Sequence, residues 1–93
     1  MMEIFKTSEH GLEVLSIDTI EKGCWINLTE PDEEELELLT RMIGAEPTFL
    51  RDPLDVEEKP RIDVEDDQIL IIVDIPYVYE DEKSIKFETL PMG

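Results

Sequence analysis

The sequence predicts an α+β fold, an α/β sandwich in which two short helices pack on a mostly antiparallel mixed sheet. Two observations support this class. Residues 61–76 combine an alternating apolar pattern with an uninterrupted apolar run, which indicates two neighbouring strands. Residues 32–43 instead place apolar side chains at helical spacing, and Pro47 opens a second short helical segment. The length predicts a single domain, residues 1–93, with one modest core.

The strand pair within residues 61–76 is predicted to form the centre of the sheet. Apolar and charged residues alternate over 61–65, as in a half-buried strand. Two aspartates then mark a turn, and the apolar run that follows over 69–73 is typical of a strand buried on both faces. Pro76 is expected to end that strand. A further strand at 85–89 is expected to pair with it in the antiparallel direction.

The first third of the chain is predicted to add three strands. Residues 2–7 and 12–17 read as a hairpin joined by a polar turn that contains glycine. Residues 24–28 form a third alternating segment. Trp25 of this segment is interpreted as an anchor, either in the core or at an interface.

The helical part is predicted from its end signals. Thr29 is expected to be the N-cap of the longer helix, with Asp32 completing a capping box. Gly44 is expected to end this helix, because glycine readily adopts the left-handed conformation at that position. Pro47 begins the shorter helix, and Pro53 is expected to interrupt it, since a proline inside a helix removes a hydrogen bond.

Charge is the strongest compositional feature. The chain has 25 acidic and 8 basic residues, a net charge of -17. This charge argues against binding to nucleic acid or to an anionic membrane surface, because both would repel the chain. Divalent cations and basic proteins remain as partners, and a solvated acidic surface that keeps the chain soluble explains the same composition.

Sequence motifs for catalysis are absent, so no enzymatic activity is expected. Cys24 is the only cysteine, which excludes an internal disulfide, and one cysteine with one histidine cannot supply the four ligands of a structural zinc site. The apolar runs are too short for a membrane helix, so this chain is not expected to span a membrane. Four acids at the predicted hairpin turn are read as a solvated turn in preference to a cation site. These acids are Asp63, Glu65, Asp66 and Asp67.

Four sequence blocks together resemble the amino-terminal cytoplasmic domain of the CorA family of magnesium transporters. The blocks are Gly-Cys-Trp-Ile-Asn-Leu at 23–28, Phe-Leu-Arg-Asp-Pro-Leu-Asp at 49–55, Lys-Pro-Arg-Ile-Asp-Val-Glu at 59–65 and the apolar run at 70–76. In that family the domain belongs to a homopentamer, and Mg²⁺ bound between neighbouring subunits holds the pore closed. Family members continue into a stalk helix and two membrane helices, so the resemblance implies a fragment at the cytoplasmic face of the cell membrane.

The resemblance also implies one metal ligand. The family aspartate that binds the regulatory ion falls on Asp52, and its partner aspartate lies on the stalk helix of the next subunit, beyond Gly93. Pro53 stands where many relatives carry an aliphatic residue, and this departure allows other interpretations, in which Asp52 caps a helical turn or is solvated. Because half of the site is missing, the isolated chain is expected to bind Mg²⁺ weakly.

Two functions are therefore compared. The first is a regulatory and assembly domain of a CorA-like transporter of divalent cations, which senses intracellular cations at its subunit interfaces. The alternative is a free-standing acidic module that binds a basic protein. The family interpretation depends on one structural condition, the burial of Ile71 and Val73 in the middle of the sheet.

Overall fold

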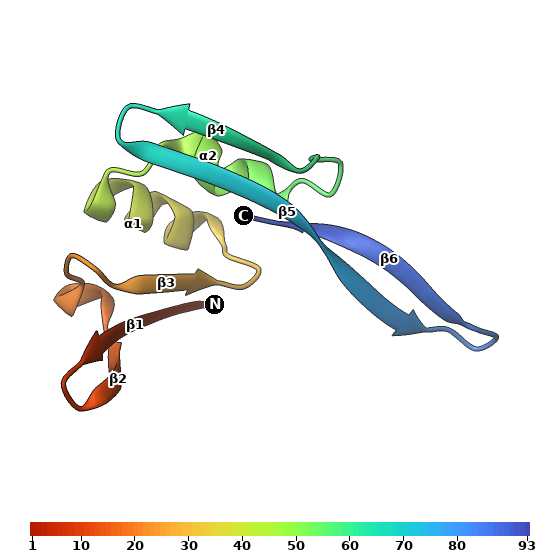
Figure 1. Cartoon of the computed structure of the whole chain (residues 1–93), viewed down its shortest axis with the longest axis horizontal. Coiled ribbons are helices and arrows are strands. Elements are labelled where there is room, and N and C mark those ends of the chain that lie inside the picture. Colours follow the sequence, from red (N-terminus) through yellow and green to blue (C-terminus); the bar gives the residue numbers. More distant parts are fainter. The chain divides into compact units, whose positions relative to one another are not determined.

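The computed structural model describes all 93 residues (Figure 1). The chain forms two compact units, residues 1–37 and 38–93, and each is described by itself. In chain order the elements are β1 (Met2–Ser8), β2 (Gly11–Leu15), the 3-10 turn η1 (Ile17–Thr19), β3 (Trp25–Leu28), α1 (Glu33–Ile43), α2 (Pro47–Arg51), the 3-10 turn η2 (Asp52–Leu54), β4 (Arg61–Glu65), β5 (Gln68–Glu80) and β6 (Ile85–Met92).

The first unit contains a three-stranded antiparallel sheet with the order β2-β1-β3. Ile4 is central and buried, and it lies opposite Leu15 on β2 and Ile26 on β3. On the alternate face Phe5 lies opposite Trp25, whose side chain is 71% exposed. Trp25 is therefore not an anchor in the core of this chain, and its role as an interface anchor stays a prediction.

The predicted cap of the longer helix is wrong by three residues. The backbone of Thr29 pairs with Met1, so Thr29 belongs to the end of the sheet. Asp32 is the residue that caps α1, because its Oδ1 accepts a hydrogen bond from the Glu35 backbone N–H at 2.8 Å. The Glu35 carboxylate accepts from the Asp32 backbone N–H at 3.1 Å, which completes a capping box. The predicted end of the helix at Gly44 is confirmed by its positive φ of 68°.

The second unit contains another three-stranded antiparallel sheet, with the order β4-β5-β6. The prediction that Pro76 ends the strand is wrong, since β5 continues to Glu80 and Pro76 lies opposite Thr89 of β6. β4 pairs with residues 68–72 and β6 with 73–80, so each part of β5 has one hydrogen-bonded neighbour. A strand with a free edge accommodates a proline because no N–H is needed on that side.

The two faces of the β4–β5 hairpin differ in burial. Leu70 and Ile72 are 5% and 2% exposed. Ile71 and Val73 point to the alternate face and are 54% and 41% exposed, so the prediction of burial on both faces is wrong. We call the face with Leu70 and Ile72 the covered face. The apolar residues of the open face are Ile62, Val64, Ile69, Ile71 and Val73.

The predicted α+β class is confirmed by the two antiparallel sheets and the two short helices. The strands are divided between two sheets, whereas one sheet was expected. Neither α1 nor α2 has the length and apolar character that crossing a membrane requires.

Candidate functional site

Asp52 lies at the junction between α2 and η2. The interruption predicted at Pro53 is present, since α2 ends at Arg51 and a 3-10 turn takes over at Asp52. Asp52 is the first residue inside that turn, and Arg51 occupies the N-cap position. Asp52 is also the C-cap residue of α2, since its backbone N–H donates to the Thr48 carbonyl. The predicted capping of the following turn by its side chain is not present, and that side chain is directed to another partner.

That partner is Arg61, the first residue of β4. Arg61 lies opposite Ile72 and therefore on the covered face of the sheet. Its Nη2 donates a hydrogen bond to Asp52 Oδ2 at 2.6 Å, and its Nε donates to Glu58 Oε1 at 3.0 Å. Its Nη1 binds Asp63. The guanidinium thus connects the α2–η2 junction, the following loop and β4.

Three carboxylates surround this single guanidinium, so the cluster has an excess of two negative charges. Burial disfavours the charged form of Arg61, but hydrogen bonds to Asp63 and Asp52 favour it, and the net result raises the pKa of Arg61 above its ordinary value. The side chains of Asp52 and Arg61 are 34% and 30% exposed. Solvent screening therefore keeps each ion pair weak.

The cluster has the donor chemistry of a divalent cation site but is not a complete one. Carboxylate oxygens are preferred ligands of Mg²⁺. In this chain the Asp52 carboxylate is already paired with a positive group, the guanidinium of Arg61. No group of three or more His, Cys, Asp or Glu side chains in the chain is arranged to hold a metal ion. Mg²⁺ retains several waters and needs only one or two carboxylates. The role of Asp52 as a metal ligand therefore stays a prediction from the family resemblance.

The four acids predicted at the hairpin turn lie in two different settings. Asp63 is drawn to Arg61, whereas Glu65, Asp66 and Asp67 are exposed at or beside the turn between β4 and β5. Asp66 has a φ of 51°, a left-handed conformation that aspartate tolerates in tight turns. The interpretation of this region as a solvated turn agrees with these positions.

Gln68 makes a connection that sequence reasoning missed. Its Oε1 accepts a hydrogen bond from the Glu46 backbone N–H at 2.7 Å, and its Nε2 donates to the Gly44 carbonyl at 2.9 Å. Both bonds hold the loop between α1 and α2 against the start of β5. The sequence signal that could have indicated this connection was the polar Gln68 at the start of an apolar strand.

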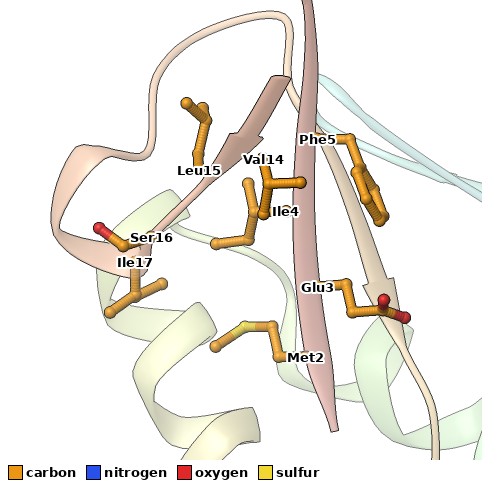
Figure 2. A pocket seen from close by; sticks show the side chains of 8 residues that line it. All are labelled: Met2, Glu3, Ile4, Phe5, Val14, Leu15, Ser16 and Ile17. Atoms are coloured by element: carbon orange, nitrogen blue, oxygen red, sulfur yellow. The ribbon is translucent and has the colours of Figure 1, made fainter. Parts of the chain in front are cut away.

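A separate pocket of about 340 Å³ lies in the first unit (Figure 2). Figure 2 shows Glu3 and Phe5 on the opposite side of β1 from Met2 and Ile4. Glu3 is the only charged residue in its lining, and its carboxylate accepts a hydrogen bond from the Asn27 amide at 3.2 Å. The pocket is lined by Met2, Glu3, Ile4, Phe5, Val14, Leu15, Ser16 and Ile17.

Comparison with known proteins supports the resemblance to CorA proteins. Over 57 residues the chain is 39% identical to the Cobalt/magnesium transport protein CorA of Methanocaldococcus jannaschii. The matched segment covers 61% of this chain and 18% of that protein, so the match spans less than a fifth of the transporter's length. No family model matches the chain, and no solved structure matches it. This segment is thus similar in sequence to part of a CorA transport protein.

Proposed function

We propose that this chain is part of the cytoplasmic regulatory and assembly domain of a CorA-like divalent cation transporter, and that it has no enzymatic activity. The observation that carries the proposal is the 39% identity over 57 residues to a cobalt/magnesium transport protein. In this proposal the segment lies at the cytoplasmic face of the membrane, and the full-length polypeptide assembles with copies of itself as a pentamer.

The proposed mechanism uses the charge of the chain. Mg²⁺ binds between Asp52 of one subunit and a carboxylate of its neighbour, and the bound ion favours the closed pore. Two carboxylates about 4 Å apart repel each other by about 4 kcal/mol at an effective dielectric constant near 20, and a divalent ion between them reverses that sign. When the Mg²⁺ concentration falls, the repulsion returns and the interface loosens. The net charge of -17 per copy adds to this effect.

The location and size of the natural polypeptide test the proposal. An antibody raised against the 93-residue chain is used to probe membrane and soluble fractions of the source cells. The proposal predicts a band in the membrane fraction that is several times larger than 10.8 kDa. A soluble band near 10.8 kDa would contradict it and would favour the free-standing acidic module that binds a basic protein.

The role of Asp52 is tested in that membrane polypeptide. The Asp52→Asn variant removes the charge and keeps the size of the side chain. We expect uptake of a divalent cation to lose its inhibition by internal Mg²⁺ in this variant. Asp66→Asn, a matched change at the exposed turn, is expected to retain the inhibition. Equal inhibition in the wild type and Asp52→Asn would remove Asp52 from the mechanism.

A further inference from the structure

The open face of the β4–β5 hairpin carries no charge, although the chain as a whole is strongly acidic. The charged residues of β4 and β5 all lie on the side of Leu70 and Ile72, because side chains alternate along a strand. They are Arg61, Asp63, Glu65, Asp74 and Glu80. A face in contact with water, in a chain of net charge -17, would be expected to carry some of the carboxylates. The distribution of charge therefore indicates that another surface covers the open face.

The open face continues along β5 and β6 beyond the hairpin. Val73 lies opposite Met92 of β6, and Ile75 and Tyr77 follow at every second position of β5. All three of these further side chains are exposed. We call the open face together with Ile75, Tyr77 and Met92 the apolar strip.

The size of the apolar strip matches what one partner contributes to a stable complex. Its side chains together expose on the order of 800 Å², and a standard interface buries about 800 Å² on each partner. The largest apolar patch on a typical monomer is smaller, at about 300–600 Å². The strip can therefore form one side of a dimer without any other part of the chain.

We propose that the apolar strip binds a second copy of this chain, with the two strips packed face to face about a two-fold axis. A two-fold contact uses the same patch on both chains, so that patch has to be complementary to itself. A charge-free sheet face meets this requirement, because no like charges are brought together. Isoleucine and valine side chains from two such faces interdigitate when sheets pack about 10 Å apart.

Charge favours a second copy over the other partners. A basic protein finds no carboxylate on the strip to pair with, and an anionic membrane surface repels a chain of net charge -17. Two copies also repel each other, but their β4 and β5 carboxylates lie on the side away from the contact. Salt screens this repulsion, so association of two copies strengthens with salt, whereas binding of a basic protein weakens.

The inference does not rest on the proposed function, because neither Asp52 nor a divalent cation takes part in the contact. A contact between two identical faces closes with two chains, so it is separate from a contact that would build a pentamer. Association of the 93-residue chain is therefore expected to be the same with and without EDTA. Failure of this inference leaves the proposed function intact, and the reverse also holds.

The test is sedimentation equilibrium of the 93-residue chain from about 10 μM to about 500 μM. The wild type is compared with Ile71→Glu, which places a charge in the strip. Val78→Glu is the matched control, because Val78 is on the same strand and equally exposed at 54%, but points to the other face. Circular dichroism shows whether each variant is folded. Ile71→Thr keeps a β-branched side chain and decides the question if Ile71→Glu does not fold.

We expect the wild type to form a dimer of twice 10.8 kDa, whose dissociation constant falls between about 0.05 M and about 0.5 M NaCl. Ile71→Glu is expected to raise the dissociation constant at least about tenfold, because an unpaired charge would be buried, and Val78→Glu less than about twofold. Ile71→Thr is expected to lie between the wild type and Ile71→Glu.

Three results would overturn the inference. A monomer under all conditions would show that a second copy does not cover the strip and would leave it to a partner of another kind. Equal effects of Ile71→Glu and Val78→Glu would place the contact elsewhere. Association that disappears in EDTA, or that weakens with salt, would indicate a contact made by charges and not by the apolar strip.

Discussion

The covered and open faces of the β4–β5 hairpin are built from almost the same residue types but have different surroundings. Leu70 and Ile72 are nearly inaccessible, whereas the neighbouring Ile71 and Val73 are about half exposed. The covered face also holds Arg61, which is bound to Asp52 in η2. The comparison shows that the apolar run itself does not decide which side of the strand is buried.

The two faces also differ in what they contribute, since the covered face stabilises the fold whereas the open face is accessible to other molecules. Side chains on the covered face stabilise the second unit because they are removed from water on folding. The open face gains little from its apolar side chains, and exposed apolar surface of this kind is typical of regions that contact other molecules. Beyond β4, the β5–β6 hairpin exposes both of its faces, because the neighbouring Tyr77 and Val78 point to opposite faces and are 45% and 54% exposed.

The largest expected effect comes from truncating the covered face. Ile72→Ala should lower the free energy of unfolding by about 2–5 kcal/mol, because it leaves a cavity in a packed core. Ile71→Ala is the matched change on the open face and should cost less than about 1 kcal/mol. Urea denaturation followed by far-UV circular dichroism measures both. Equal losses in the two variants would show that the faces do not differ as described.

A smaller loss is expected when the Gln68 connection is removed. Gln68→Ala should lower the free energy of unfolding by about 1–2 kcal/mol, because the Glu46 N–H and the Gly44 carbonyl both lose a partner. Glu65→Ala changes the exposed residue opposite Gln68 on β4 and serves as the control. Hydrogen exchange should accelerate at the Glu46 amide in Gln68→Ala alone. Unchanged exchange there would contradict the role given to Gln68.

The smallest effect is expected at the tip of the β5–β6 hairpin, where local hydrogen bonds replace packing. Asp81 Oδ1 accepts from the backbone N–H groups of Lys83 and Ser84, both at 2.9 Å, and Asp81 Oδ2 pairs with Lys86 at 3.0 Å. The Lys83 hydrogen bond, the Lys86 contact and the Ser84 hydrogen bond together lower the pKa of Asp81 below its ordinary value.

A lowered pKa in the folded state means that ionised Asp81 stabilises the tip above the unfolded value of 3.8, and that this contribution is lost as the pH falls through the folded value. The Lys83 and Ser84 amides should therefore shift in NMR spectra below about pH 4, while the Ile72 amide stays fixed. Asp81→Asn keeps an acceptor oxygen but cannot ionise, and it should abolish the transition. A transition of the same size in Asp81→Asn would exclude Asp81 as its origin.

Local signals predicted most elements of the fold. The turn at Asp66, the helix end at Gly44 and the interruption at Pro53 follow from backbone preferences of single residues, and all three are present. The cap at Asp32 was misplaced because Thr29 also fits the cap pattern, and only its pairing with Met1 excludes it. β5 continues through Pro76 because this part of the strand has a neighbouring strand on one side only. The local sequence does not show how many neighbours a strand will have.

The candidate site was predicted only in part. Asp52 was identified through the family resemblance, but its pairing with Arg61 depends on a fold that brings η2 beside β4. In the sequence Arg61 was a charged residue of an alternating strand and part of the family-like block at 59–65, and neither observation indicated its partner. The exposure of Ile71 and Val73 contradicts their predicted burial, which was the structural condition for the family interpretation. The identity to the cobalt/magnesium transport protein does not depend on that burial and supports the resemblance.

The most direct test of the account is a Mg²⁺ titration of the 93-residue chain, followed by backbone amide chemical shifts. The account predicts that millimolar Mg²⁺ shifts the amides of Asp52, Glu58 and Arg61 more than those of Asp66 and Asp67. A result in which all acidic residues respond equally, or in which the exposed turn responds most, would contradict the proposal that Asp52 is a ligand for a divalent cation.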